Sequence, residues 1–501
     1  MNFRALQLSS LSHFLGRPFF QVAALAATLC ALPAYTQTPS DYRLLATPIT
    51  PGPADPAITA ALSQVSEARI RQTIEKLVGF GTRSTLSSIE TDLPAGTGVT
   101  AAADWIFSQL EEASKQCGGC LEVKRDTFTQ PVADRIPKPT TITNVYAILR
   151  GSDPVQAKRM YLVTGHYDSR NSDTLDDHGA APGANDDASG VAVSLECVRV
   201  LSQLSKSHPF AASLVFVAVA GEEQGLNGSA HLAKLARSEN WQLEGVLNND
   251  IVGGNTTPGD TLQRKDLVRV FSEGIPVNAS ADQQRRIRAL GIAEDGPSRQ
   301  LARAMADVGQ TYLNGGKKDG AFSAFLVARP DRYLRGGDHT SFNREGFTGV
   351  RVTEWREDFN HQHQNIRVEN GVQYGDLLQF VDFAYVAKVA RLNAATLATL
   401  AAGPGLPTEV KLVTTKLDND TTIQWKAPEG MKADAHYELL WRETTAGSWQ
   451  FAKTVPAGPA EISVTVPISK DNVIFGVRAV DAAGHRGLAE VPGVRVPEPT
   501  K

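Results

Sequence analysis

The residues best suited to chemistry in this chain follow apolar stretches of strand length. His166 ends one such stretch, 160–166, and Asp168 stands two residues further on. Side chains two residues apart on a strand point to the same face, which brings this imidazole and this carboxylate together. By itself, the pair is equally typical of a core histidine that a neighbouring aspartate satisfies. The other acidic residues of the chain decide between these two interpretations.

A pair of adjacent glutamates, Glu222 and Glu223, directly follows another apolar run of strand length. Neighbouring buried carboxylates repel each other unless a cation or a proton lies between them. Asp186 alone would be explained as a helix cap, and Asp250 alone as a turn residue. Together with His166, these carboxylates predict that one or two divalent metal ions are bound.

The chemistry of such a site assigns a role to each residue. Zinc accepts histidine nitrogen and carboxylate oxygen, and two zinc ions about 3.5–4 Å apart need a bridging carboxylate, which suits Asp186. Asp168 suits the role of orienting the His166 imidazole. Because adjacent residues at a strand end point in different directions, Glu223 can bind metal while Glu222 acts as general base on a metal-bridged water. The predicted reaction is hydrolysis, in which Glu222 returns the proton to the leaving amine.

Strands and helices alternate around these residues. The expected strands are 121–128, 140–149, 159–166, 214–220, 243–249 and 349–353. The expected helices are 58–78, 101–114, 191–204, 229–237, 281–309 with a break near 291–297, and 374–398. This alternation predicts an α/β fold in which a mixed, largely parallel sheet is sandwiched between helices. Ligands of such folds bind beyond the carboxyl ends of the strands, where the candidate residues stand.

The first 36 residues, 1–36, are typical of a secretory signal peptide. Arg4 and Arg17 precede an apolar run of small residues, 19–32, and a polar stretch begins at Tyr35. A transmembrane anchor is the alternative, but it needs about 20 apolar residues and this run is shorter. No later segment is apolar enough to span a bilayer. We therefore expect an exported protein, periplasmic or extracellular, with no membrane span after signal removal.

The cysteines fit this destination. Cys117 and Cys120 stand close together in a chain expected to reach an oxidising compartment, so we expect a local disulfide. A redox pair or half of a zinc ribbon is the alternative, although no second Cys-x-x-Cys motif completes four ligands. Cys197 lies in an apolar helical pattern and is expected to be a buried free thiol.

The composition changes beyond the last expected helix. Residues 401–407 are rich in alanine, glycine and proline, as linkers are, and short alternating strands follow them. Residues 408–501 are therefore expected to form a small all-β sandwich with Trp425 and Tyr437 in its core. This segment resembles a fibronectin type III domain. Residues 37–400 are left for the catalytic domain.

Four motifs stand in an order that is typical of one enzyme family. They are His166-Tyr-Asp168, Pro182-Gly-Ala-Asn-Asp186-Asp-Ala-Ser-Gly190, Ala220-Gly-Glu222-Glu223-Gln-Gly-Leu226 and Asp250. Together they resemble the secreted di-zinc aminopeptidases, whose distant relatives include glutamate carboxypeptidase and glutaminyl cyclase. The resemblance covers roughly residues 69–398. It implies that His166 and Asp250 bind one zinc ion and Glu223 the other, with Asp186 as the bridge.

The resemblance also implies Glu222 as general base, Asp168 as its companion and a late histidine as the last zinc ligand. In the family, this histidine precedes an aspartate by four residues, and His361 precedes Asn365 by the same interval. We expect His361 to be the ligand, and His363 is the alternative. His339 resembles a family residue near the substrate site that does not bind metal.

The sequence thus predicts a metal-dependent aminopeptidase that acts on peptides or proteins with free N-termini and holds two zinc ions, or cobalt or manganese in their place. A carboxypeptidase or dipeptidase on the same site, or a non-catalytic surface-binding protein, is the alternative. Because glutaminyl cyclases use one zinc ion, the full ligand set favours hydrolysis. The formal charge of −4 and the lack of a long basic run give no indication of nucleic acid binding. The sequence does not indicate a partner for the C-terminal segment.

Overall fold

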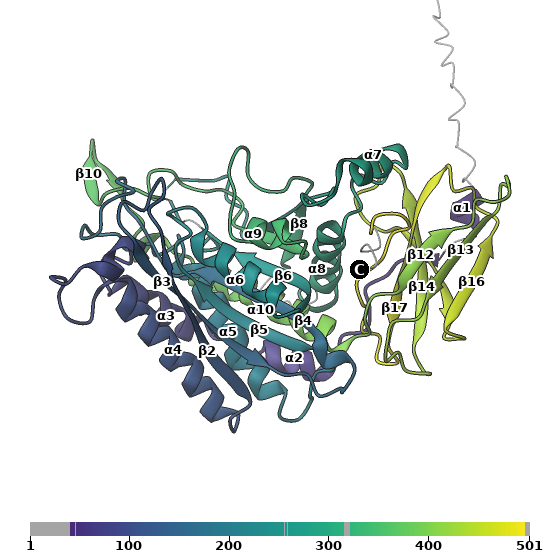
Figure 1. The fold of residues 1–501 in the computed structure, drawn as a ribbon, viewed down its shortest axis with the longest axis horizontal. Coiled ribbons are helices and arrows are strands. Elements are labelled where there is room, and N and C mark those ends of the chain that lie inside the picture. Colours follow the sequence, from purple (N-terminus) through teal and green to yellow (C-terminus); the bar gives the residue numbers. More distant parts are fainter. Residues whose placement is uncertain (1–40, 46, 255, 258, 315–320, 496–501) are drawn as a thin grey trace, which may run out of the picture.

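The structure is a computed structural model, and it describes residues 41–45, 47–254, 256–257, 259–314 and 321–495. The expected signal peptide, residues 1–36, lies outside these residues. Figure 1 shows a large body of helices and strands, purple to green, and a smaller body of strands, green to yellow, beside it. Within the described part of the chain, no helix is long and apolar enough to cross a membrane.

An eight-stranded mixed sheet with the order β2-β3-β5-β4-β6-β9-β7-β8 forms the centre of the larger body. Its strands are β2 (Leu121–Gln130), β3 (Thr140–Leu149), β4 (Arg159–His166), β5 (Ser213–Val219), β6 (Gln242–Asn249), β7 (Leu267–Ser272), β8 (Ser323–Val327) and β9 (Gly349–Thr353). The central strands β5, β4, β6 and β9 run parallel. Antiparallel pairs attach β3 to β5, β2 to β3 and β7 to β9. The predicted α/β fold with a mixed, largely parallel sheet is confirmed.

Helices cover both faces of this sheet. The helices of the described chain, not all of which touch the sheet, are α1 (Asp41–Leu44), α2 (Pro56–Leu62), α3 (Glu67–Val78), α4 (Gly98–Gln116), α5 (Ala188–Leu204), α6 (Asn227–Ser238), α7 (Ala281–Ala289), α8 (Pro297–Tyr312), α9 (His339–Arg344) and α10 (Phe383–Ala402), with short 3-10 turns at Thr85–Ile89, Gln156–Lys158 and Leu378–Phe380. Apolar residues of α3, α4, α5, α8 and α10 share one core with the sheet, and α6 and α9 bury theirs in a second core. Because both faces are covered, β4 and β5 are buried along their whole length and read as continuous apolar runs.

Two facing sheets form the smaller body. One contains β12 (Thr408–Leu412), β13 (Thr421–Lys426) and β16 (Glu461–Val466), and the other contains β1 (Thr47–Pro48), β14 (His436–Glu443), β15 (Phe451–Pro456) and β17 (Val473–Val480). Trp425 of the first sheet packs edge-on against Tyr437 of the second, with ring centroids 5.3 Å apart. The predicted β-sandwich and its two core aromatics are confirmed. The likeness to a fibronectin type III domain stays a prediction.

The connection between the two bodies differs from the expected linker, 401–407. Helix α10 continues to Ala402, and the residues that follow it are buried against the larger body. The buried guanidinium of Arg159 donates hydrogen bonds to the carbonyl oxygens of Gly403 and Pro404. Composition alone indicates a linker, but these backbone groups are satisfied by protein rather than by water. The two bodies are therefore joined by a packed segment.

The N-terminal boundary of the catalytic domain also differs from the expected one. Residues 47 and 48 were expected in the catalytic domain, but they pair as β1 with β15 of the sandwich. The Trp441 indole donates to the carbonyl oxygen of Tyr42, and the Tyr42 hydroxyl donates to Glu443. Described residues before α2 therefore contact the C-terminal sandwich, although they are far from it in the sequence.

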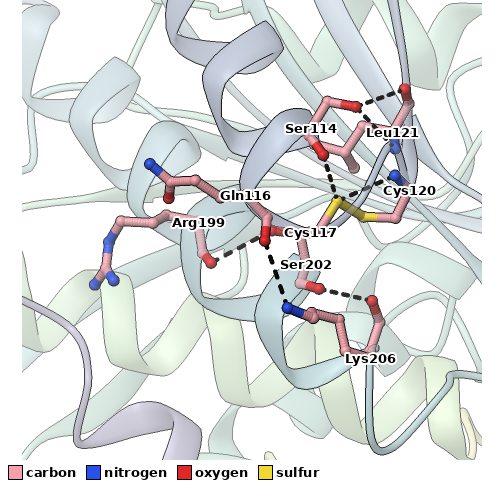
Figure 2. Close-up of a disulfide and its surroundings, with 9 residues drawn as sticks. Ser114, Gln116, Cys117, Cys120, Leu121, Arg199, Ser202 and Lys206 are labelled. Atoms are coloured by element: carbon pink, nitrogen blue, oxygen red, sulfur yellow. Dashed lines mark hydrogen bonds between the residues drawn. A yellow bond between two sulfur atoms is a disulfide. The ribbon is translucent and has the colours of Figure 1, made fainter.

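The disulfide between Cys117 and Cys120 is present, and Cys197 is a buried free thiol, as predicted. Figure 2 shows this disulfide at the turn between α4 and β2. Gly118 and Gly119, with φ angles of 86° and 83°, form the turn, because only glycine adopts this region at low cost. The disulfide therefore links two cysteines within a single tight turn of the chain.

Candidate metal centre

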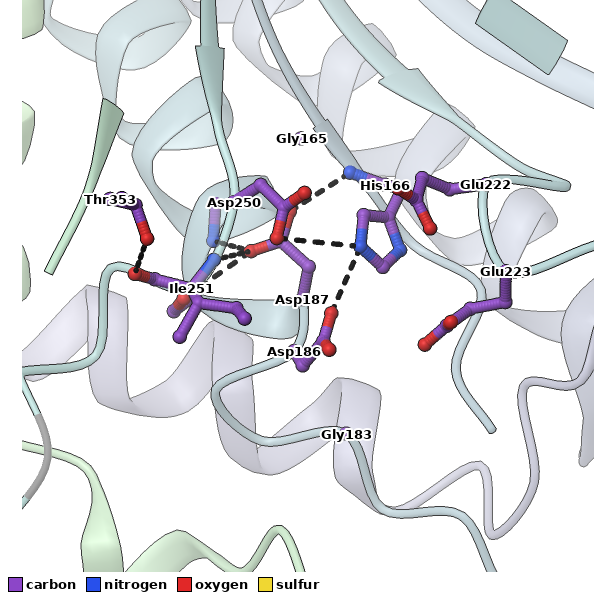
Figure 3. Close-up of polar contacts among 12 residues, drawn as sticks. Gly165, His166, Gly183, Asp186, Asp187, Glu222, Glu223, Asp250, Ile251 and Thr353 are labelled. Atoms are coloured by element: carbon purple, nitrogen blue, oxygen red, sulfur yellow. Dashed lines mark hydrogen bonds and ion pairs between the residues drawn. The ribbon is translucent and has the colours of Figure 1, made fainter. Parts of the chain in front are cut away.

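Three adjacent parallel strands deliver the predicted site residues to one edge of the sheet. His166 is the last residue of β4, Glu222 and Glu223 follow β5, and Asp250 follows β6. Because β5, β4 and β6 are neighbours, their carboxyl ends lie side by side. Figure 3 shows these side chains gathered in one place, with Asp186 beside the ring of His166.

Close packing between α5 and the strand ends brings the aspartates of the second motif into the site. A Cβ atom on Gly165 would lie 2.5 Å from the carbonyl carbon of Gly190, and one on Gly190 would lie 2.2 Å from the carbonyl oxygen of Asn249. Glycine at both positions lets the first turn of α5 approach β4 and β6. Asp187 then accepts hydrogen bonds from the backbone N–H groups of Gly190 and His166. The peptide bond between Asp187 and the residue before it is cis.

The carboxylate of Asp186 lies between two histidines. Its Oδ1 atom is 3.0 Å from Nε2 of His166, and its Oδ2 atom is 2.8 Å from Nε2 of His363. Asp250 Oδ1 lies 3.9 Å from the same nitrogen of His166, and Glu223 Oε1 lies 3.1 Å from that of His363. Each histidine thus shares Asp186 and has one further carboxylate of its own. Two neighbouring cations with one bridging carboxylate would require an arrangement of this kind.

The structure places His363, and not the expected ligand His361, beside Asp186 and Glu223. The ring of His361 stacks on Phe380 with centroids 3.6 Å apart, and its Nδ1 atom lies 3.7 Å from Asp358, away from the metal-binding groups. Burial lowers the pKa of this imidazole. The four-residue spacing to Asn365 indicated His361, but His363 adopts a φ angle of 59° and its side chain faces the cluster. No pattern in the sequence predicts the turn that directs His363, rather than His361, toward the cluster.

Asp168 lies behind His166, where the sequence predicts it. Its Oδ1 atom is 3.5 Å from Nδ1 of His166, and its carbonyl oxygen is 3.0 Å from the same nitrogen. Its carboxylate also accepts hydrogen bonds from the backbone N–H groups of Glu222 and Glu223 and from the Thr85 hydroxyl. One buried carboxylate thus orients the imidazole and fixes the turn that carries both glutamates.

Four further charged residues hold the site, and none of them was predicted from the sequence. Asp376 accepts the backbone N–H of Asp186 at 2.7 Å, and the buried guanidinium of Arg83 donates to the carbonyl oxygens of Pro182 and Gly183. These contacts fix the segment before α5. Their partners are backbone groups of distant segments, so no spacing rule predicts them.

The other two are arginines that contact the carboxylates themselves. Arg351 lies in β9 with its Nη1 2.5 Å from Asp250 Oδ2, and Arg170 donates from Nε to Glu223 Oε2 at 2.9 Å. The position of Arg351 in the sequence could have identified it as a partner of a buried carboxylate. A charged residue inside an apolar strand needs a buried partner, and Asp250 follows the neighbouring strand. His339 lies outside the cluster, where it bonds to the carbonyl oxygen of Pro330.

The pKa values of His166 and Glu222 are both raised, but for different reasons. Burial disfavours the charged imidazole of His166, but Asp168 and Asp186 outweigh this effect and raise its pKa well above the ordinary value. Desolvation raises the pKa of Glu222 well above its ordinary value, and the nearby Asp250 carboxylate adds to the rise. The site therefore concentrates negative charge that protons or cations must balance.

The free ligand atoms fit metal ions. Among the described residues, Glu223 Oε1 is buried and has no hydrogen-bond partner, whereas Oε2 is held by Arg170. Within this cluster, two groups of side chains offer ligand atoms that lie within 4.8 Å of one another: His166, Glu222 and Asp250, and Asp186, Glu223 and His363. Imidazole nitrogen with carboxylate oxygen is the donor set that zinc accepts, and cobalt or manganese can use it as well.

An open cleft of about 860 Å³ leads to this cluster. Its walls are formed by residues 133–135, 222–227, 332, 335–336, 359 and 362–364, together with Arg170, Asp186 and Asp250. Glu222 lies in its wall and is partly exposed, while the proposed ligands beneath it are mostly buried. A peptide can therefore reach the carboxylates from solvent, as a hydrolytic site requires.

Known proteins with similar sequences agree with this geometry. The model of peptidase family M28 matches residues 144–370, which contain all the residues of the cluster. A probable zinc metalloprotease of Leptosphaeria maculans is 42% identical over 445 residues, which are 89% of this chain and 98% of that protein. A probable zinc metalloprotease of Pyricularia oryzae is 44% identical over 446 residues, which are 87% of this chain and 84% of that protein.

Solved structures resemble the chain more distantly. The LapA aminopeptidase of Legionella pneumophila matches with a TM-score of 0.48 and 18% identity, over 72% of this chain and 79% of that one. A glutaminyl cyclase of Fimbriiglobus ruber matches with a TM-score of 0.42 and 18% identity, over 67% of this chain and 95% of that one. Likeness of this extent says nothing about activity. The matching family model and the relatives of similar length are sufficient, and the chain belongs to peptidase family M28 as a zinc metallopeptidase.

Proposed function

We propose that the protein is an exported aminopeptidase that holds two zinc ions and removes residues from the free N-termini of peptides. The observation that carries this proposal is the position of Asp186, whose two carboxylate oxygens face His166 and His363 at 3.0 and 2.8 Å. His166 and Asp250 would hold one ion, and Glu223 and His363 the other. Asp186 would bridge them.

When held by these residues, the zinc ions would supply Lewis acidity toward the scissile carbonyl and the attacking water. Glu222 takes a proton from the attacking water and returns it to the leaving amine, since it lies in the cleft wall. Asp168 keeps Glu222 in place through the backbone N–H bond, and Gln362 donates to Asp186 Oδ2 at 2.9 Å. Arg170 holds one oxygen of Glu223 and leaves the other free for metal.

The four motifs around His166, Asp186, Glu222 and Asp250, which resemble those of the di-zinc aminopeptidases, support action at N-termini. The charge of the cleft does not select the substrate end, because two zinc ions would balance its four carboxylates.

Export is supported by two features of different kinds. Residues 1–36 have the pattern of a signal peptide. The disulfide between Cys117 and Cys120 is of the kind that persists in oxidising compartments. We therefore place the enzyme in the periplasm or outside the cell.

The test compares reporters that differ only at their ends. Leucine 4-nitroanilide, its N-acetyl derivative and a C-terminally free N-acylated dipeptide would be assayed with the zinc-loaded protein and after chelation. We expect turnover of the first reporter alone, its loss with a chelator and its return with zinc or cobalt. Turnover of the acylated dipeptide alone would show a carboxypeptidase instead. No turnover of any reporter after metal return would overturn the proposed activity.

A further inference from the structure

The cleft holds one cation that no carboxylate of the described residues neutralises. Four arginines line it, and three of them form ion pairs: Arg170 with Glu223, and Arg332 and Arg335 with Glu357. Arg135 forms no ion pair with any residue that the structure describes. Its Nη1 atom donates to the carbonyl oxygen of Glu223 at 3.0 Å. This guanidinium therefore keeps most of its donors free.

The loop that carries Arg135 is fixed at its base. It connects β2 to β3, and the backbone groups of Ala133 and Ile136 exchange hydrogen bonds of 3.0 and 3.1 Å across it. Ile136 is fully buried, whereas Arg135 itself is exposed. Because buried Ile136 anchors the loop, Arg135 is held at the cleft. Less conformational entropy of the loop is therefore lost when a ligand binds to Arg135.

The position of Arg135 relative to the reacting groups indicates which part of a substrate it meets. Its guanidinium contacts the peptide group of Glu223, one residue from the proposed base Glu222. Because Glu222 must reach the leaving nitrogen, the residue that follows the scissile bond and carries this nitrogen lies along this wall of the cleft. One residue of extended chain spans about 3.3–3.6 Å, so groups on that residue are within reach of Arg135.

We propose that Arg135 binds a carboxylate on the residue that follows the scissile bond, and so selects substrates with an anionic group there. That carboxylate is either the α-carboxylate of a dipeptide or the side chain of an aspartate or glutamate in a longer peptide. Guanidinium binds carboxylate with two parallel hydrogen bonds, which makes this recognition directional. The inference rests on the proposed aminopeptidase activity and adds a substrate class to it.

Two pairs of substrates distinguish the two sources of the carboxylate. Leu-Ala and Leu-Ala-amide differ in the α-carboxylate, and Leu-Asp-Ala-amide and Leu-Asn-Ala-amide differ in the side chain. We expect kcat/KM to be higher for the acidic member of at least one pair by roughly tenfold, mainly through KM. Screening should weaken this preference as salt is raised.

Arg135→Ala and Arg135→Lys test the residue, and Lys138→Ala is the matched control. Lys138 lies on the same loop, is 67% exposed and faces Glu90 at 3.7 Å, so its removal changes the charge of the loop without touching the cleft. In Arg135→Ala, the ratio of kcat/KM between acidic and neutral substrates should fall close to one, and lysine should restore part of it. Lys138→Ala should keep the parental ratio.

A binding measurement separates this inference from the activity on which it rests. Calorimetry of Leu-Ala and Leu-Ala-amide with the zinc-loaded Glu222→Gln variant, with and without Arg135→Ala, reports carboxylate recognition without turnover. Tighter binding of Leu-Ala that depends on Arg135 supports the inference even if the parent hydrolyses nothing, a result that would remove the proposed activity alone. Equal affinities and equal kcat/KM values for both members of both pairs would overturn the inference and leave the aminopeptidase activity intact.

Discussion

At the scale of single residues, the adjacent glutamates Glu222 and Glu223 have different proposed roles. Glu223 points its free oxygen toward His363, whereas Glu222 lies near His166 and lines the cleft. The residues differ only in direction, because neighbouring side chains at a strand end diverge. One is therefore proposed as a ligand and the other as a base.

Glu222→Gln tests this division. Glutamine keeps the shape of the side chain but cannot carry the proton, so we expect kcat to fall by about 10²–10⁴. Zinc content, measured by mass spectrometry of the purified protein, should stay at the parental value. A variant that loses zinc together with activity would contradict the assignment of Glu222 as base.

Most of the candidate site could be predicted from the sequence, and the reasons are local. His166, Glu222 and Glu223 stand at the ends of apolar runs, and parallel strands bring such ends together. The choice between His361 and His363 could not be predicted, because a loop conformation decides it. Motif spacing identifies residues on regular elements better than residues on loops.

At the scale of elements, the site depends on how closely α5 approaches β4 and β6. Gly165 and Gly190 face each other across this contact, with no space for a side chain. The first turn of α5 follows Asp186 and Asp187 directly, so any displacement of the helix moves the proposed bridge. The sequence marks these glycines only as part of a motif, and the close approach explains their presence.

Gly190→Ala should therefore destabilise the protein and impair the site. A Cβ atom 2.2 Å from a backbone oxygen forces the helix or the strand to shift, which typically costs about 1–3 kcal/mol. We expect a lower midpoint of thermal unfolding by circular dichroism, together with reduced zinc content. Gly447→Ala is the control, because its Cβ atom would meet nothing within 4 Å. Equal unfolding midpoints for both variants would contradict the packing argument.

The regular elements around the site were predictable, and the connections between them were not. Strands β3, β4 and β9 have the bounds expected from apolar runs. Helix α10, however, starts at Phe383 rather than near residue 374, because residues 372–374 pair as β11 (Val372–Tyr374) with β10 (Arg367–Glu369). Cross-strand pairing of a short polar hairpin overrides its weak helical pattern.

At the scale of the whole molecule, the β-sandwich is an integral part of the structure rather than a tethered module. Asp295, before α8, accepts two hydrogen bonds from Arg442 of the sandwich, at 2.8 and 2.7 Å, and one from Arg303 at 2.8 Å. The indole of Trp449 donates to Gln300 across the same interface. Breaking a buried ion pair from one side leaves an uncompensated charge, so these contacts hold the two bodies together.

Arg442→Ala should separate the bodies without changing the residues of the site. It leaves Asp295 buried with one partner fewer, which typically costs about 3–5 kcal/mol. We expect faster proteolysis of the connecting segment and a lower unfolding midpoint, with little change in zinc content. Lys416→Ala removes an exposed cation of the sandwich and serves as the control. Identical proteolysis of the two variants would contradict an integral sandwich.

The same interface predicts a dependence of stability on pH. His485 lies 2.8 Å from Asp481 and 3.1 Å from Asp55 of the N-terminal arm. Burial opposes protonation of His485, but the two carboxylates outweigh it and raise its pKa. The pKa of Asp481 is lowered, because His485 and backbone donors outweigh its burial.

A raised histidine pKa stabilises the fold fully below about pH 6.5, and this contribution is lost as the pH rises through the raised value. A lowered aspartate pKa stabilises the fold above about pH 3.9 and fails only as the pH falls through the lowered value. We therefore expect the unfolding midpoint of the parent to exceed that of His485→Gln by more at pH 5.5 than at pH 9. A difference that grows with pH would contradict this sign.

The measurement that tests the central claim most directly is the number of zinc ions per chain in the parent, His361→Ala and His363→Ala. It counts metal ions without relying on any assay of activity. With Asp186 as the proposed bridge between two metal ions, we expect two ions in the parent, two in His361→Ala and one in His363→Ala. A parent that binds a single ion at saturating zinc, or a loss in His361→Ala equal to that in His363→Ala, would contradict the proposed two-metal site.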